Sequence, residues 1–170
     1  ITGTLFFLLF FKHREFSLLL LRDWIFVSFL VIIFVYDLRH MLILDRFTIP
    51  AMIVAIILNL WLGTPAAGIM LLGALVIGGF FFVQFALSNG TWVGGGDIRM
   101  GVLMGLILGL SQGLVALFLA YLLGAFIGVM LVVMKKAGGK TPIPFGTFLT
   151  TATAVLLFFG DAPLQWYLSF

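Results

Sequence analysis

The sequence Gly94-Gly95-Gly96-Asp97 stands directly before a long apolar run that begins at Ile98. A carboxylate at the mouth of an apolar helix is costly near bilayer depth unless it is solvated or paired, so it marks a candidate functional site. A second carboxylate of this kind is Asp37, which ends the apolar run of residues 24–36. We therefore interpret the rest of the chain as a scaffold that brings Asp37 and Asp97 together.

The composition is that of a membrane protein. Of the 170 residues, 64% are hydrophobic and 9% are charged, whereas soluble chains are about 45–50% apolar and about 25% charged. The apolar residues come in blocks separated by short polar or glycine-containing breaks, a pattern typical of polytopic helical membrane proteins. We predict an all-α polytopic membrane protein with about six to seven transmembrane helices, folded as one membrane-embedded domain over residues 1–170.

The blocks predict the positions of the helices. Residues 1–11 are too few to span a bilayer about 30 Å thick, which takes about 20 residues, so we expect the chain to be the C-terminal part of a longer protein. A processed N-terminus or a short half-helix is the alternative. We expect helices over residues 1–11, 24–38, 48–62, 67–87, 98–110, 114–134 and 147–159.

The lysines and arginines predict the orientation of these helices. When the helix ends alternate, six of the nine basic residues fall on the side that also holds Asp37 and Asp97. The positive-inside rule makes that side cytoplasmic, in a multi-pass protein of the cytoplasmic (inner) membrane. The six are Arg39, Arg46, Arg99, Lys135, Lys136 and Lys140, and the other three are Lys12, Arg14 and Arg22.

Glycine recurs every fourth residue after Asp97, at Gly101, Gly105, Gly109 and Gly113. This spacing places the glycines along one helix face, where a neighbouring backbone can approach closely. We expect this face to hold Asp97 against the helix that carries Asp37. General tolerance of glycine in membrane helices is the alternative.

Several kinds of chemistry are poorly supported by the sequence. The chain has no cysteine and therefore no thiolate metal site or cysteine nucleophile within these residues. His13 and His40 fall on opposite sides of the predicted membrane, so we predict no metal site, and His40 is interpreted as an interfacial polar residue. The glycine-rich stretch lacks the Lys-Ser/Thr ending of a phosphate-binding loop, and the net charge of +3 reflects short basic loops rather than a nucleic-acid surface.

The carboxylate pair remains. Two carboxylates close together in a poorly solvated site share one proton, so the ionised group can take a proton from water while the other hydrogen-bonds the scissile carbonyl. This is aspartic-protease chemistry with Asp37 and Asp97 as the catalytic pair, and it needs no cofactor. Gly94, Gly95 and Gly96 are expected to let the substrate backbone approach and the loop flex.

Asp45 and Asp161 are not part of the predicted pair, and two other functions remain open. Asp45 is interpreted as a solvated ion pair with the adjacent Arg46, and Asp161 as a surface residue. A small ion or proton-coupled carrier could use the same two aspartates as a proton relay. A structural assembly subunit would need neither carboxylate.

The ordered motifs resemble the type IV prepilin peptidases, which are membrane aspartyl proteases with a Gly-x-Gly-Asp motif. The second catalytic motif is matched by Gly94-Gly95-Gly96-Asp97-Ile98-Arg99, with Arg99 where lysine is usual. The first is matched from Tyr36-Asp37 to Asp45, with Leu44 where the family has proline, and Pro144-Phe145-Gly146 matches a C-terminal segment. The Pro-Ala-Leu motif of presenilin-like proteases is absent from the sequence.

The resemblance implies a substrate class and a further domain upstream of these residues. It implies that Asp37 and Asp97 cleave prepilin or pseudopilin precursors after a glycine, behind a short basic leader and before an apolar helix, at the cytoplasmic face. Bacterial members often carry an upstream cytoplasmic domain that methylates the new N-terminus. Any zinc or S-adenosylmethionine site would lie in that domain, and a short peptidase-only form is the alternative.

Overall fold

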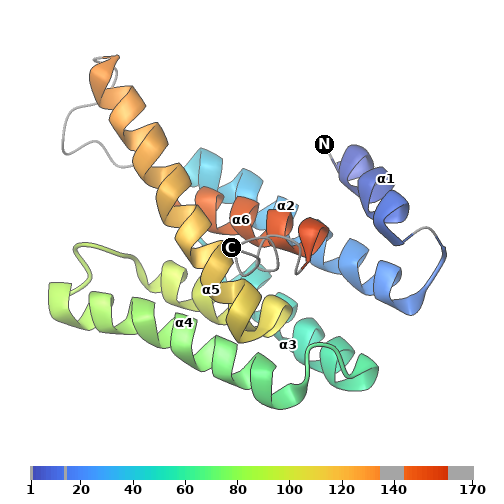
Figure 1. Ribbon diagram of the computed structural model, residues 1–170. Coiled ribbons are helices and arrows are strands. Elements are labelled where there is room, and N and C mark those ends of the chain that lie inside the picture. The colour runs from blue at the N-terminus through green and yellow to red at the C-terminus, as the bar shows by residue number, and fades with distance from the viewer. Residues whose placement is uncertain (1, 14, 135–143, 161–170) are drawn as a thin grey trace, which may run out of the picture.

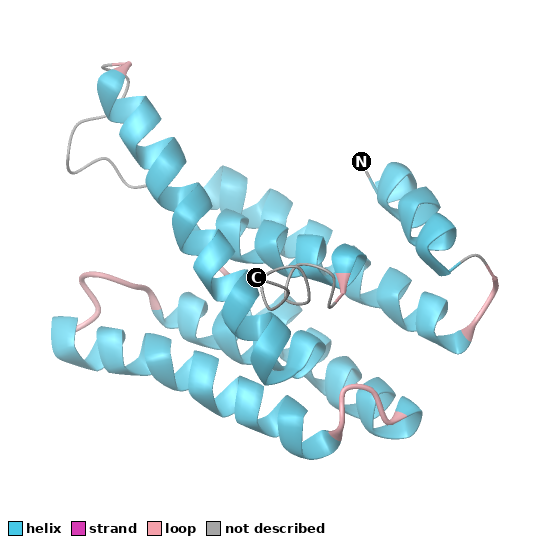
Figure 2. Ribbon diagram, in the orientation of Figure 1, coloured by secondary structure: helices cyan, strands magenta, loops and turns pink. Residues whose placement is uncertain are grey.

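A computed structural model describes residues 2–13, 15–134 and 144–160, and this part of the chain is built from helices without strands (Figures 1 and 2). The all-α prediction is confirmed. Among the described residues four helices, α2 to α5, are long and apolar enough to cross a membrane, which agrees with a multi-pass protein. The helices are α1 (Thr2–His13), α2 (Leu18–His40), α3 (Asp45–Leu62), α4 (Ala67–Ser88), α5 (Gly95–Val133) and α6 (Phe145–Phe159).

Helix α5 consists of two limbs that meet at Gly109. The backbone of Gly109 has φ 74° and ψ −169°, which is not helical and which residues with a side chain rarely adopt. The first limb runs along α4 and the second leaves in another direction (Figure 1). We predicted a break at residues 111–113; it lies slightly earlier, at the glycine whose backbone makes the turn.

The glycine face of α5 packs on α4. A methyl group added at Gly105 would lie 2.2 Å from the carbonyl carbon of Gly73, and one added at Gly101 would lie 2.6 Å from the ring of Phe81. The close approach was expected, but the partner helix was not: α5 meets α4 here rather than the Asp37 helix, α2. Helix α4 supplies its own small residue, Gly73, at the crossing, which lets the two backbones touch.

Four helices begin earlier than predicted; α5 begins at Gly95 rather than at residue 98, and α6 at Phe145 rather than at residue 147. Helix α2 begins at Leu18 rather than near Trp24, because the hydroxyl of Ser17 accepts a hydrogen bond from the N–H of Leu20 and caps the helix. Helix α3 begins at Asp45 rather than at Thr48, whose hydroxyl donates to the carbonyl of Leu44 inside the first turn. The connection between these two helices is therefore the uncharged loop of residues 41–44, shorter than the gap of residues 39–47 between the predicted helices.

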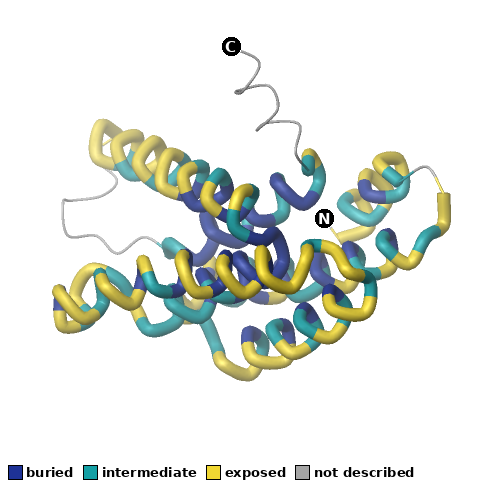
Figure 3. Tube along the Cα trace, turned by 60° about the horizontal axis from the view of Figure 1, so that its bottom comes forward, coloured by how far each residue is buried: buried dark blue, intermediate teal, exposed yellow. Residues whose placement is uncertain are grey.

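Burial separates an inner core from an apolar outer surface (Figure 3). Side chains on the facing sides of the helices are buried, including Phe26, Phe81 and Leu149. On the outside, Leu75 and Phe118 are 72% and 71% exposed. A large apolar exposed surface is the expected exterior of a protein solvated by lipid.

A polar cluster ties three helices together at the end of α2 that is far from Asp37. Asp23 is fully buried and pairs with Arg22 at 2.7 Å and with Nε2 of His13 at 3.0 Å. Arg22 also donates to the carbonyl of Thr64 at 2.6 Å and to the side chain of Asn59 at 3.3 Å. A buried carboxylate needs such partners. We therefore interpret this cluster as a structural one that holds α1, α2 and the end of α3 together.

Candidate active site

Asp37 lies in the last turns of α2 and is almost completely buried, with 3% of its surface exposed. Its carboxyl group has the backbone N–H of Thr147, in the first turn of α6, as a hydrogen-bond partner. Oxygen Oδ2 is buried and has no hydrogen-bond partner among the described residues. A buried carboxyl oxygen without a protein partner is available to a water molecule or a substrate.

Asp97 lies in the first turn of α5 and caps that helix. Its Oδ2 accepts a hydrogen bond from the N–H of Gly94 at 2.9 Å, and its own N–H donates to the carbonyl of Gly94 at 3.0 Å. A carboxylate in the first turn also meets the positive end of the helix dipole. The tight turn at Gly94 therefore fixes the direction of the Asp97 side chain.

The fold brings the two carboxyl groups to the same end of the bundle. They lie close enough for their charges to interact, although they are 60 residues apart in sequence. Between them the chain runs out through α3 and returns through α4. The described structure thus contains a pair of neighbouring aspartates, one buried and one partly buried.

The three glycines before Asp97 have different surroundings. A methyl group added at Gly96 would lie 2.7 Å from Cβ of Ile43, a distance that real side chains do not tolerate. One added at Gly95 would meet nothing within 4 Å, and one added at Gly94 would make an ordinary contact of 3.6 Å with Asp97. A glycine is therefore required at position 96 for packing. Gly94 and Gly95 have room for a side chain, so packing does not require glycine at these two positions.

Gly146 is a site residue to which sequence reasoning assigned no role. A methyl group at Gly146 would lie 2.7 Å from Oδ2 of Asp37 and 2.7 Å from Cδ1 of Ile43. The Pro144-Phe145-Gly146 turn before an apolar helix was visible in the sequence, but its contact with Asp37 depends on how α6 packs against α2. Ile43 carried no sequence signal, since it is one aliphatic residue among many.

The remaining predicted residues lie apart from this pair or outside the described residues. Asp45 is exposed and pairs with Arg99 of α5 rather than with Arg46, which corrects the partner we expected. His40 is exposed at the end of α2, where its ring lies 4.4 Å from that of Tyr36, and His13 pairs with Asp23. Asp161 and the lysines at 135, 136 and 140 lie outside the described residues.

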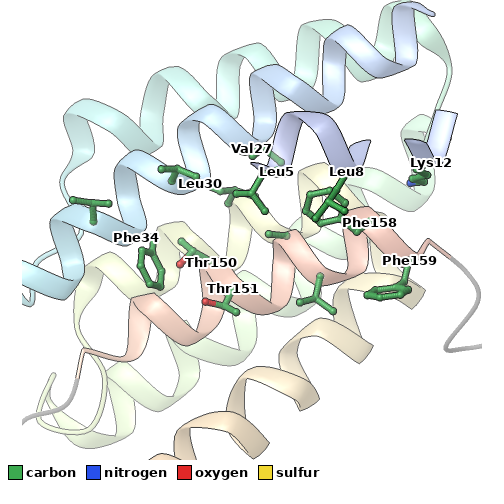
Figure 4. A pocket seen from close by; sticks show the side chains of 14 residues that line it. Leu5, Leu8, Lys12, Val27, Leu30, Phe34, Thr150, Thr151, Phe158 and Phe159 are labelled. Atoms are coloured by element: carbon green, nitrogen blue, oxygen red, sulfur yellow. The ribbon is translucent and has the colours of Figure 1, made fainter. Parts of the chain in front are cut away.

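An apolar cavity of about 480 Å³ lies between α1, α2 and α6, close to Asp37 (Figure 4). Phe34 of α2 and Thr150 of α6, each three residues along its helix from Asp37 and Thr147, line one end, and Lys12 lines the other end. Apart from Lys12, its walls carry no ionisable side chain. Within the described residues no group of three or more His, Cys, Asp or Glu side chains could hold a metal ion.

The sequence is similar to that of known proteins. Residues 24–129, which include both aspartates, match the model of the type IV leader peptidase family. The chain belongs to this family. The match favours a peptidase over the carrier that the sequence had left open. No solved structure is significantly similar to the chain.

Relatives from two organisms carry the same description. The prepilin leader peptidase/N-methyltransferase of Aeromonas salmonicida strain A449 is 31% identical over 154 residues, which are 88% of this chain and 52% of the relative. The protein of that name from Aeromonas hydrophila matches with the same identity and coverage. The chain spans about half the length of the curated relatives it matches.

Proposed function

We propose that this protein is a membrane aspartyl endopeptidase that removes the leader from type IV prepilin-like precursors, with Asp37 and Asp97 as the catalytic pair. The observation that supports it best is that the two carboxyl groups lie at one end of the bundle, close enough for their charges to interact, in a member of a leader peptidase family. The proposed cleavage follows a glycine and precedes an apolar helix, so the scissile bond reaches the membrane surface where the aspartates lie.

The chemistry follows from a pair that holds one proton. The ionised carboxylate takes a proton from a water molecule, whose oxygen attacks the carbonyl carbon of the scissile peptide. The protonated carboxyl donates a hydrogen bond to the carbonyl oxygen as it gains negative charge. When the tetrahedral intermediate collapses, the C–N bond breaks and the leaving amine takes a proton from the pair. The step consumes one water molecule and requires no cofactor.

The structure suits a reaction at a membrane surface. Asp37 and Asp97 each lie at the end of an apolar helix, and Arg39, Arg46 and Arg99 lie at the same end of the bundle. We place this end at the cytoplasmic face of the inner membrane, by the positive-inside rule. Counting α1, the two limbs of α5 and α6 with the other helices gives seven membrane-embedded segments, the upper limit of the range we expected.

Product analysis tests the proposal. Protein in liposomes is mixed with a precursor that has a short basic leader, a glycine and an apolar helix, and the products are identified by mass spectrometry. We expect a single cut after the glycine. An intact precursor, together with proton flux across the same liposomes, would instead support the carrier.

A further inference from the structure

The loop of residues 41–44 is attached to both segments that carry the aspartates. At its start, Met41 has a left-handed backbone with φ 53°, and its N–H donates to the carbonyl oxygen of Asp37 at 2.7 Å. At its end, Asp45 forms an ion pair with Arg99, two residues beyond Asp97. The loop is therefore connected to the segment that carries Asp37 and to the segment that carries Asp97.

Ile43, in the middle of this loop, fills the space between the two segments. Its Cβ lies 2.7 Å from the position of a methyl group added at Gly96, and its Cδ1 lies 2.7 Å from the position of a methyl group added at Gly146. Gly96 precedes Asp97 in the chain, and Gly146 lies against the carboxyl group of Asp37. One aliphatic side chain thus touches the backbone on both sides of the pair.

We propose that Ile43 is a positioning residue that sets the spacing between Asp37 and Asp97. It acts through the two glycines: with no Cβ at Gly96 or Gly146, the Ile43 side chain is what keeps the first turn of α5 and the first turn of α6 apart. The inference rests on the proposed function only in that the two aspartates act as a pair. Ile43 itself bears no group that takes part in the reaction.

The kinetic test shortens the side chain. In Ile43→Ala Cβ stays against Gly96, but Cδ1, the atom of Ile43 nearest Gly146, is lost. Because a misplacement of about 1 Å can lower a rate about 100-fold, we expect kcat to fall by about that factor. KM should change by less than about threefold, since no group that binds the precursor is removed. Ile43→Val also loses Cδ1 but keeps the rest of the side chain, so it should lower kcat in the same direction and by less than Ile43→Ala.

A matched control comes from the same loop. Leu42 is 58% exposed, and Leu42→Ala removes as much aliphatic side chain next to Ile43. We expect this variant to keep the kcat of the wild-type protein. An equal loss of kcat in Leu42→Ala and Ile43→Ala, or an unchanged kcat in Ile43→Ala, would overturn the proposal.

A second test measures the distance between positions 37 and 97 and does not depend on precursor cleavage. The chain contains no cysteine, so Asp37→Cys/Asp97→Cys can be cross-linked with bifunctional thiol reagents of graded length. We expect the best reagent length to change when Ile43→Ala is added, and not when Leu42→Ala is added. If Ile43→Ala does not fold, Ile43→Val is used in the same comparison.

The two tests separate the inference from the proposed function. If Ile43→Ala shifts the cross-linking but the wild-type protein cleaves no precursor, the role of Ile43 is supported and the peptidase proposal is contradicted. If the wild-type protein cleaves the precursor but cross-linking is identical with Ile43, Ile43→Ala and Ile43→Val, the peptidase proposal is supported and the role of Ile43 is contradicted.

Discussion

Gly146, in the first turn of α6, lies directly against the carboxyl group of Asp37 in α2. The position of a methyl group on Gly146 is 2.7 Å from Oδ2 and 2.9 Å from Cγ of Asp37. The next residue, Thr147, provides a backbone N–H to the same carboxyl group. The start of α6 therefore forms one wall of the proposed catalytic site, and the lack of a side chain at Gly146 is what lets Asp37 fit.

Gly146→Ala should therefore abolish most activity. The added methyl group must displace the Asp37 carboxyl or the Ile43 side chain, and we expect precursor cleavage to fall about 100-fold. Gly68→Ala is the control, because a methyl group there meets nothing within 4 Å. Equal cleavage rates for the two variants would show that α6 does not support Asp37 as described.

Gly96 and Gly95 offer the same comparison beside Asp97. Gly96→Ala forces a methyl group to within 2.7 Å of Ile43, whereas Gly95→Ala enters open space. We expect cleavage to fall at least tenfold in the first variant, because the first turn of α5 must shift. The second should stay within about 0.5 kcal/mol of the wild-type stability, because the space beside Gly95 is open. A stronger effect of Gly95→Ala would contradict the packing at this turn.

The crossing of α4 and α5 should be equally sensitive to added volume. Gly105→Ala would place a methyl group 2.2 Å from the backbone of Gly73, and since overpacking costs about 1–3 kcal/mol, we expect a loss at the upper end of that range. Denaturant unfolding in detergent measures it. Gly79→Ala on α4, where nothing lies within 4 Å, should unfold like the wild-type protein.

Leu44 stands where the family has proline, and the backbone conformation of Leu44 is compatible with a proline. Its φ of −85° and ψ of 134° are close to those of proline, and its N–H makes no hydrogen bond within the described residues. Leu44→Pro should raise the free energy of unfolding by about 0.4–1 kcal/mol, because it restricts the unfolded chain. A fall in the unfolding midpoint would show that the loop cannot hold this geometry.

Much of the fold was predictable because membrane helices are long apolar runs between polar breaks. The α4 bounds agree with the expected range of residues 67–87 to within one residue, since the turn at Gly63-Thr64-Pro65 and the polar Ser88-Asn89-Gly90 are clear breaks. The start of α2 was missed because residues 16–21 are as apolar as the helix itself, so only the Ser17 cap marks the boundary.

What sequence could not supply was the choice of neighbours. The glycine repeat after Asp97 indicated a close helix contact, but its partner depends on which helix presents a matching small residue, and that is Gly73 of α4. For the same reason Asp45 was assigned to the adjacent Arg46 although it pairs with Arg99 across two helices. Ile43 and Gly146 join the candidate site through contacts between distant segments, which no local pattern reports.

The central claim is that Asp37 and Asp97 act together as the catalytic pair. The most direct measurement is the rate of precursor cleavage by Asp37→Asn and Asp97→Asn, with Asp45→Asn as a matched control from the same end of the bundle. A positioned acid or base contributes about 10²–10⁴-fold to a rate, so each of the first two variants should lose at least about 100-fold while remaining folded in the membrane.

Asp45→Asn loses only an exposed ion pair worth about 0.2–1 kcal/mol and should keep cleavage within about fivefold of the wild-type rate. Substantial cleavage by purified Asp37→Asn or Asp97→Asn would contradict the account.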